Sequence, residues 1–444
     1  LSWPVLLFAF GATLGTALLS GLAPAMRLAK MNLNVSLREG GRGVAGSRAA
    51  ERMRASLVVG ECMLAIMLLA GAGLLIRSLA NLRSVDPGFR TDGILSMNVG
   101  ASRGRATNGE QMAEHYRTLV ERLKNTPGVA DASAVASLML SETPFSGMLT
   151  LEDRPPFPEE EQIEATMDSV SPGFFRMMKV PLVYGSYFPE RVRGDSQGVA
   201  IINRTFAQKY WPGRDPVGKK FTFGIPNERT RWVTIIGVVE DMHRRGLHRP
   251  ARLETFFSID QNPRNNFQIL VSAANGDALS LVPAVRAQVR ALDPSGTITQ
   301  VETVAANLGE SLAARRFQTM LLTLFAALAL LLAAVGIFAL LYQTVRRRTQ
   351  EIGVRMALGA RRADVVALVV RRGMILVLAG GALGIAGAAA IGRLLGGMLF
   401  GVEPVDVASY GFAGVALCLL GFAACWLPAH LAARVDPLVA LRHD

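Results

Sequence analysis

Long apolar runs alternate with polar stretches along the chain, and the apolar runs give the first indication of its architecture. Four runs reach the length of about 18 residues that lets a helix cross the hydrocarbon core of a bilayer: 5–23, 57–76, 319–342 and 410–427. A fifth run, 374–391, is equally long but rich in Gly and Ala, with Gly380 and Gly384 at GxxxG spacing. Small residues at this spacing let two membrane helices pack closely. We therefore predict five membrane spans.

The polar block 80–316 has the shorter patterns of a folded domain. Residues 199–203 and 232–240 are rich in β-branched side chains, which predicts strands. Amphipathic helices are predicted at 110–125, 204–211 and 279–292. A block of this length can bury a core of its own and accommodate two subdomains. The predicted fold class is an α-helical transmembrane bundle with a large mixed α/β domain.

The positive charges indicate the orientation in the membrane. The chain has 47 Lys and Arg against 35 Asp and Glu, a formal net charge of +12. Lys and Arg concentrate in the connections 26–56 and 343–373, whereas the short loop 395–409 has none. Because positive residues accumulate on cytoplasmic loops, we place both basic connections and the C-terminus in the cytoplasm. The block 80–316 then lies in the periplasm, and nucleic-acid binding becomes a minor alternative.

The two ends of the chain carry a repeat. Residues 24–38 align with 428–442, with matching Pro, Ala, Val, Leu and Arg positions. Each copy follows an apolar run on the cytoplasmic side, and such repeats are common in transport proteins. We interpret residues 1–40 as the end of one unit and 41–444 as a second unit. The alternative is that two similar helix exits arose independently.

Motifs that carry catalytic chemistry are not recognisable. The stretch Gly213–Lys220 nearly matches the phosphate-binding pattern GxxxxGK[ST], but Lys replaces the final hydroxyl residue and a strand-like segment follows. A turn explains it better. His243 and His248 lack the spacing of a helical metal pair, and we expect them on a surface loop with the neighbouring arginines Arg244, Arg245 and Arg249. We predict no catalytic residue, no cofactor and no metal site.

Glu61 is the one acid inside a predicted span. An ionisable residue within the membrane is a functional hypothesis by default. Glu61 is also only about one turn from Ser56 and the cytoplasmic surface. We favour a structural role in which Glu61 pairs with Arg54 or with a neighbouring helix.

The basic segment 346–366 between two spans has features of a docking helix. Glu351 and Arg355 are four residues apart with the acid first, which supports a helix. Ile352, Met356 and Gly359 or Ala360 share one face and form a narrow apolar stripe. Such a stripe suits a helix that docks into a groove on a cytoplasmic partner. The alternative is a helix that lies in the lipid interface.

Several motifs together resemble the FtsX/MacB-type permeases of ABC transporters. The cytoplasmic motifs are Glu351–Ala360, Arg361–Val365 and Trp426–Arg442, and a loop motif is Leu399–Pro404. In the polar block, Val170–Phe175 and Ala200–Gly218 resemble the family's periplasmic domain. The similarity covers essentially residues 41–444. The repeat additionally resembles the duplicated variety of this family, often described as orphan permeases.

This resemblance implies a permease subunit of an exporter or mechanotransmission complex in the bacterial inner membrane. A separate cytoplasmic ABC ATPase docks at the coupling helix of such permeases, and in the MacB branch ATP hydrolysis is transmitted to the periplasmic domain. The implied ATPase contacts are Glu351, Ile352, Gly353, Arg355, Met356, Ala357, Leu358 and Gly359. Further implied partners are membrane lipid, a periplasmic or outer-membrane protein, and a second permease unit in a dimeric arrangement. The alternative is a non-transport regulator whose periplasmic domain controls a periplasmic partner; a membrane-bound hydrolase is disfavoured.

The predicted organisation combines these features. A last helix and tail of a preceding unit (1–40) and a basic linker (41–56) precede a span (57–79) and the periplasmic domain (80–316). After the domain come a span (317–342), the coupling segment (343–373), a span (374–394), a short periplasmic loop (395–409), a span (410–427) and a cytoplasmic tail (428–444).

Overall fold

The computed structural model describes most of the chain in two compact units. The described residues are 3, 6–8, 10–11, 13–15, 17–18, 44–102, 108–137, 145–154, 164–192, 197–228, 230–244, 246–347, 354–355, 358, 361–394, 396 and 399–432. A helical unit comprises Leu1–Gly73, Thr323–Arg393 and Val405–Asp444, and a mixed unit comprises Leu74–Leu322 and Leu394–Pro404. Each unit is described by itself.

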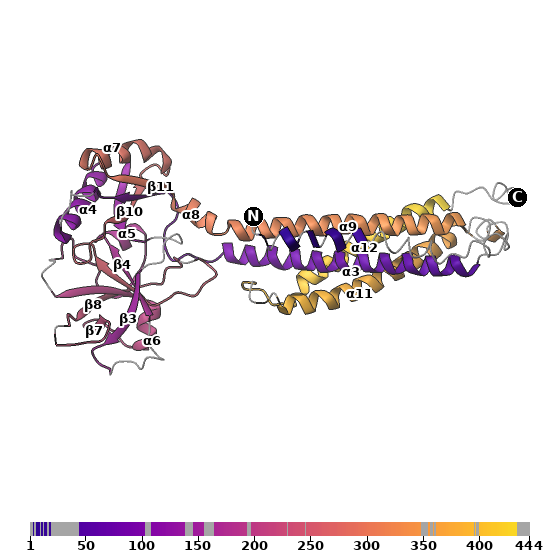
Figure 1. Cartoon of the computed structure of the whole chain (residues 1–444), viewed down its shortest axis with the longest axis horizontal. Coiled ribbons are helices and arrows are strands. Elements are labelled where there is room, and N and C mark those ends of the chain that lie inside the picture. The colour runs from indigo at the N-terminus through magenta and orange to yellow at the C-terminus, as the bar shows by residue number, and fades with distance from the viewer. Residues whose placement is uncertain are drawn as a thin grey trace. The chain divides into compact units, whose positions relative to one another are not determined.

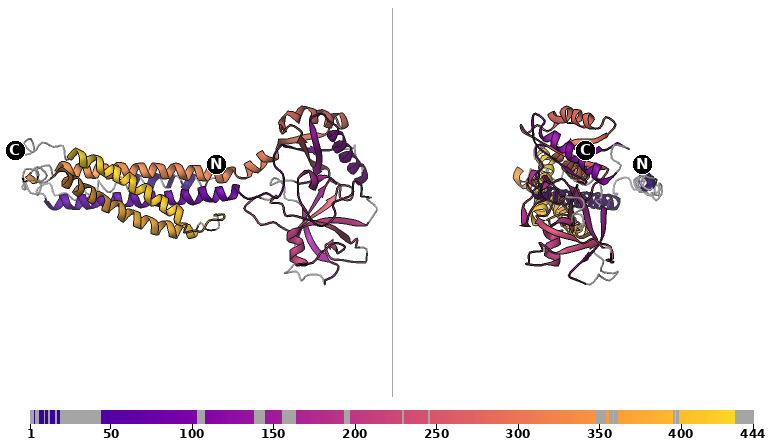
Figure 2. Two further views of the ribbon diagram at one scale, coloured as in Figure 1. Left: turned by 180° about the vertical axis from the view of Figure 1, so that it is seen from behind. Right: turned by 90° about the vertical axis from the view of Figure 1, so that its left-hand side faces the viewer.

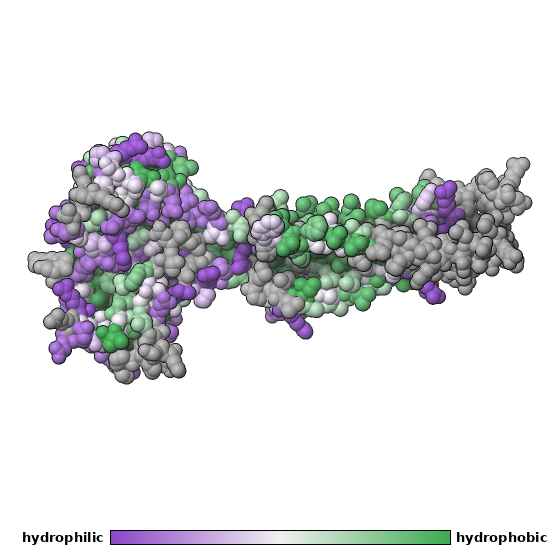
Figure 3. Space-filling model, in the orientation of Figure 1, coloured by the Kyte–Doolittle hydropathy of each residue, from purple (hydrophilic) through white to green (hydrophobic). Residues whose placement is uncertain are grey.

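The helical unit is built from four long helices that run beside one another (Figures 1 and 2). They are α3 (Val44–Arg83), α9 (Ala313–Arg347), α11 (Arg362–Leu394) and α12 (Val407–Ala432). In the part of the chain that the structure describes, each of the four is long and apolar enough to cross a membrane. Much of their apolar surface faces outward, as the green band in Figure 3 shows. Such a surface is the one that a helix presents to lipid.

Four of the predicted apolar runs lie inside these helices. The runs are 57–76 in α3, 319–342 in α9, 374–391 in α11 and 410–427 in α12. The run 5–23 coincides with a shorter apolar helix at Leu6–Gly15, and its crossing of the membrane stays a prediction. The repeated tails 24–38 and 433–442 lie outside the described residues.

The mixed unit begins with an antiparallel sheet that two helices cover. Its strands are β11 (Thr297–Thr303), β1 (Ile94–Gly100), β10 (Asn266–Ala273) and β2 (Val129–Val135), in that order. Helices α4 (Gly109–Lys124) and α7 (Val282–Leu292) pack on it and enclose a core that includes Tyr116, Leu119, Phe267 and Val285. We call this part the sheet lobe (Figure 1).

The remaining strands close on themselves. The order is β4 (Glu164–Val170), β3 (Phe145–Leu151), β7 (Lys220–Phe223), β8 (Val233–Val239), β6 (Gly198–Asn203) and β9 (Glu254–Ser258). Because β9 also pairs in parallel with β4, these strands form a barrel without a free edge. The short strand β5 (Leu182–Gly185) pairs with β8 from outside this ring. We call this part the barrel lobe.

Very little backbone pairing joins the two lobes. Strands β2 and β4 share one residue pair, Val135 with Val170. An apolar cluster fills the junction around α5 (Phe174–Met177), with contributions from both lobes. Side-chain packing therefore holds the lobes together more than sheet hydrogen bonds do.

The predicted elements of the polar block are confirmed with small shifts. The predicted strands 199–203 and 232–240 are β6 and β8. The predicted helices 110–125, 204–211 and 279–292 are α4, α6 (Arg204–Tyr210) and the pair η2 (Leu279–Leu281) with α7. The side chains of Asn108 and Asn203 accept hydrogen bonds from backbone N–H groups in the first turns of α4 and α6, which is why both helices begin there. Gly213 and Gly218 have φ of 70° and 85°, as the turn interpretation of this stretch requires.

Candidate functional site

Between α9 and α11 the structure describes Val354, Arg355, Leu358 and Arg361. The backbone N–H of Leu358 donates to the carbonyl oxygen of Val354 at 3.0 Å, which forms one helical turn. Val354 is exposed, and Leu358 is 83% exposed. This turn therefore presents two apolar side chains, four residues apart, in a connection that also contains several arginines. Of the predicted ATPase contacts the structure describes Arg355 and Leu358, and Val354 was not among them. The remaining predicted contacts lie outside the described residues: Glu351, Ile352, Gly353, Met356, Ala357 and Gly359.

Polar contacts tie α3 to its neighbours at the same end of the helical unit. The guanidinium of Arg54 on α3 donates to the side-chain oxygen of Gln343 on α9. Arg372 on α11 pairs with Glu51 on α3 at 2.8 Å. These contacts connect the helices on both sides of the Val354–Leu358 turn through α3. Both α9 and α11, which flank the turn in the chain, are thus joined to α3 by side-chain contacts.

The side chain of Glu61, on α3, points to α9, and its expected partner Arg54 forms a hydrogen bond elsewhere. Arg54 contacts Gln343, so the anticipated Glu61–Arg54 pair is not formed. The Glu61 carboxyl faces Gly336 of α9 so closely that a Cβ at this glycine would lie 2.3 Å from Oε2. Oε2 is buried and accepts no hydrogen bond from the described residues. Because Gly336 has no side chain, the Glu61 carboxyl fits against α9 at this position.

The glycines of α11 are the surface on which α3 packs. A Cβ at Gly380 would lie 2.5 Å from the Cβ of Cys62, and one at Gly384 would lie 2.7 Å from the Cβ of Ile66. Both would also approach carbonyl oxygens of α3 at 2.7 Å. The close helix approach predicted from the GxxxG spacing is confirmed, with α3 as the partner.

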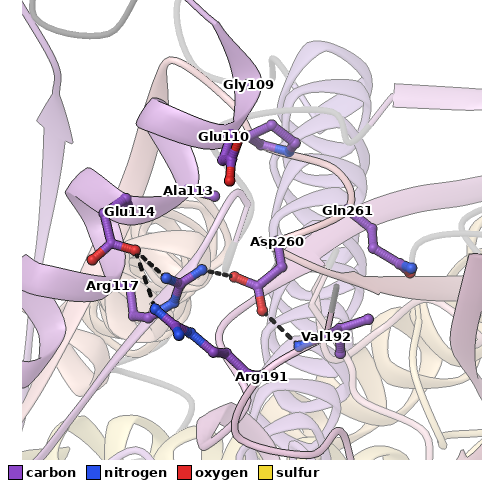
Figure 4. A pocket seen from close by; sticks show the side chains of 10 residues that line it. Gly109, Glu110, Ala113, Glu114, Arg117, Arg191, Val192, Asp260 and Gln261 are labelled. Carbon is purple, nitrogen blue, oxygen red and sulfur yellow. Dashed lines mark hydrogen bonds and ion pairs between the residues drawn. The ribbon is translucent and has the colours of Figure 1, made fainter. Parts of the chain in front are cut away.

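A polar cavity of about 700 Å³ opens in the mixed unit beside α4 (Figure 4). Arg117 of α4 points into it and donates to Asp260, whose other oxygen accepts the backbone N–H of Val192 at 2.9 Å. Glu114 pairs with Arg117 and lies 3.7 Å from Arg191. Burial works against the charge of Arg117, but the hydrogen bond and charge of Asp260 outweigh it and raise the Arg117 pKa. Both arginines thus lie beside carboxylates. These ion pairs and hydrogen bonds, which line the cavity, join α4 to the loops before β6 and β10.

Arg244 forms a second, buried clamp, where the sequence predicted a surface arginine. The prediction is wrong, because the Arg244 side chain is only 4% exposed. Its guanidinium donates to Asp168 of β4 and to Glu254 of β9, with Nη2 at 2.9 Å from Glu254. It also donates to the carbonyl oxygen of Ser137, just beyond β2, at 2.5 Å. One side chain therefore links the strands of the barrel seam to the edge of the sheet lobe.

The electrostatics of this clamp follow from burial and pairing. Burial lowers the Arg244 pKa, but the charges and hydrogen bonds of Glu254 and Asp168 outweigh it and raise the pKa. Burial raises the pKa of Glu254, and Arg244 opposes that rise. Removal of the guanidinium would leave two buried carboxylates without a compensating charge, which is strongly destabilising.

The histidines near Arg244 occupy the predicted loop but are half-buried. His243 Nδ1 lies 3.2 Å from the carbonyl oxygen of Arg249. Burial and the charges of Arg315 and Arg249 lower the pKa of His248. Within the described ranges, no group of three or more His, Cys, Asp or Glu side chains is arranged to hold a metal ion.

Comparison with known proteins gives two family matches that together span most of the chain. Residues 55–292 match the family described as MacB-like periplasmic core domain, and residues 323–437 match the family described as FtsX-like permease C-terminal. The first match includes the strands and helices of both lobes up to α7. The second includes α11, α12 and the connection before α11.

Individual relatives are export proteins of this kind. The chain is 25% identical over 422 residues to the macrolide export ATP-binding/permease protein MacB of Acinetobacter baylyi, covering 90% of this chain and 58% of that protein. It is 37% identical over 279 residues to the protein of the same name from Nitrosomonas europaea, covering 59% and 40%. The periplasmic region of MacB from Actinobacillus actinomycetemcomitans matches 50% of this chain and 94% of that structure, at 14% identity and a TM-score of 0.32.

The chain spans about 40–58% of the length of these two curated relatives. Four long apolar helices and a mixed α/β domain confirm the predicted fold class, a membrane protein with a periplasmic domain. The chain belongs to the FtsX/MacB-type permeases of ABC transporters.

Proposed function

We propose that this chain is the permease subunit of an exporter in the bacterial inner membrane and couples a separate cytoplasmic ATPase to its periplasmic domain. The observation that carries the proposal is the exposed apolar turn Val354–Leu358 in the basic connection between α9 and α11. Two outward apolar side chains on a positively charged segment suit a protein groove better than water. The curated relatives are named ATP-binding/permease proteins, which supports an ATP-binding partner for this chain.

In this proposal the chain contributes no catalytic residue of its own. The bound ATPase pushes on residues 351–359, and the contacts of Arg54 and Arg372 pass the displacement to α3. Helices α3 and α9 continue into the mixed unit, to Arg83 and from Ala313. A push on the cytoplasmic turn therefore reaches the domain through continuous helices. A second permease unit and a periplasmic or outer-membrane partner complete the proposed assembly.

A matched pair of substitutions tests the docking role. Leu358→Asp places a charge on the proposed contact, whereas Val407→Asp places the same charge at the start of α12, where the side chain is also 83% exposed. Losing a buried Leu costs about 1.5–3 kcal/mol, so we expect at least a tenfold drop in the ATP-binding protein that co-purifies with L358D. V407D retains the partner. Equal recovery by both variants, with both inserted in the membrane, would remove the basis of the proposal.

A further inference from the structure

A groove opens between α11 and α12 at the end of the helical unit where α11 begins. Its volume is about 610 Å³, and its walls are Arg362, Ala363, Val366, Ala367 and Val370 of α11 and Phe422, Trp426 and His430 of α12. The two helices lie side by side there (Figure 2). Both sets of residues recur every four positions, so each helix contributes one continuous stripe.

The groove changes from polar to apolar along its length. Arg362 and His430 lie at the end nearest the predicted cytoplasm, since α11 begins and α12 ends there. Val370 and Phe422 lie at the other end, about 12 Å further into the membrane at 1.5 Å per residue. Phe422 and Trp426 are 51% and 45% exposed, so this wall faces outward. The groove therefore has a positive mouth and an apolar interior.

The aromatic wall is arranged for the boundary between lipid headgroups and acyl chains. The rings of Trp426 and His430 stack at 5.1 Å between centroids and 14° between planes. Trp is enriched at this depth because its ring is apolar and its N–H is polar. Within the described part of the chain, no carboxylate pairs with Arg362. The nearby Asp364 accepts the backbone N–H of Arg361 at 3.2 Å, as a helix cap.

We propose that this groove binds an anionic phospholipid of the cytoplasmic leaflet, with the phosphate at Arg362 and His430 and an acyl chain along Val366, Val370 and Phe422. Charge complementarity favours this occupant, because basic pockets between membrane helices on the cytoplasmic side bind anionic headgroups. The proposal goes beyond ATPase coupling. It depends only on the predicted orientation of the chain in the membrane, with the start of α11 on the cytoplasmic side. A bound lipid holds the first turns of α11, to which the coupling segment is attached.

Quenching of Trp426 fluorescence by brominated lipid tests this proposal in the full chain. Two sets of phosphatidylcholine nanodiscs contain the same minor fraction of phosphatidylglycerol, an anionic phospholipid. In the first set, the phosphatidylglycerol has dibrominated acyl chains. In the second set, the phosphatidylglycerol is unbrominated and an equal amount of phosphatidylcholine has dibrominated chains instead. Subtracting the signal of Trp426→Phe isolates Trp426 from Trp3, Trp211 and Trp232.

We expect about fivefold stronger quenching when the anionic lipid carries the bromine, since one basic residue at the surface contributes about 1 kcal/mol. Arg362→Gln removes this preference and Arg362→Lys retains it. The matched control Arg371→Gln, on the same helix but outside the groove, leaves it intact. Equal quenching by both lipids would show ordinary annular lipid only and overturn the proposal. Absence of quenching by either lipid would show that protein fills the groove, which also overturns it.

Discussion

Replacing Arg244 by Met is the perturbation whose effect the structure specifies most closely. Met has a similar length and no charge, so the change removes the guanidinium while it leaves much of the volume filled. Asp168 and Glu254 then remain as two carboxylates with side chains that are 0% and 5% exposed. The contact of the guanidinium with the Phe256 ring, 5.0 Å from its centroid, is lost as well.

The expected size of the effect follows from this burial. Removing one partner of a buried ion pair typically costs about 3–5 kcal/mol, because the remaining charge stays buried without compensation. For a domain of this size, that loss corresponds to a fall in Tm of about 6–20 °C. Acidic pH lessens the effect, since burial raises the pKa of Glu254 and its protonated form tolerates burial better than the carboxylate does.

Thermal unfolding of the full chain in detergent micelles measures this change, with Trp211 and Trp232 reporting on the mixed unit. Arg204→Met is the matched control, because Arg204 pairs with Glu240 at 3.0 Å on the exposed surface. An exposed pair contributes about 0–1 kcal/mol, so the Tm of the control stays within about 4 °C of that of the unchanged chain. Glu254→Gln in the Arg244→Met background recovers part of the loss. Equal, small effects of both arginine substitutions would refute the assignment of Arg244 as a buried clamp.

Two further predictions concern helix packing and pH. Gly380→Ala forces α11 away from Cys62 and destabilises the helical unit by about 1–3 kcal/mol. The control Gly381→Ala leaves the stability unchanged, because its Cβ would lie 3.6 Å from the nearest atom. Denaturation of both variants in detergent measures the difference. His248, whose pKa is lowered by burial and by Arg315, stabilises the fold above its ordinary pKa of about 6.5. This stability is lost as the pH falls through the lowered value, because the unfolded chain binds the proton more readily. The fall in Tm between pH 7.5 and 5.5 should therefore be smaller in His248→Gln than in the unchanged chain. The same fall in both would show that His248 does not cause this pH dependence.

The sequence was sufficient for features that depend on local patterns. Apolar length identified the helices α3, α9, α11 and α12, and the GxxxG spacing identified the close approach at Gly380 and Gly384. Short β-branched runs located β6 and β8, and amphipathic patterns located α4 and α6. These signals need only a few neighbouring residues, so they are visible without the fold.

Features that depend on distant pairing were not predictable. The barrel closes through pairs such as Thr166 with Glu254, which are 88 positions apart in the chain, and no local pattern specifies that register. Arg244 lies in a stretch of His, Arg and Gly that looks like a solvated loop, and only its contacts with β4 and β9 make it a buried residue. The space beside Glu61 comes from Gly336, on a helix that lies 275 positions further along the chain.

The measurement that tests the central claim most directly is photo-crosslinking from position 358 in native membranes. A photoreactive residue replaces Leu358, which is 83% exposed on the turn between α9 and α11. Mass spectrometry then identifies the captured molecules, with position 407 as the control for nonspecific capture. The account predicts that an ATP-binding subunit is captured at 358 and not at 407. Capture of lipid alone at 358, with the chain correctly inserted, would contradict ATPase coupling and favour a regulator without a motor.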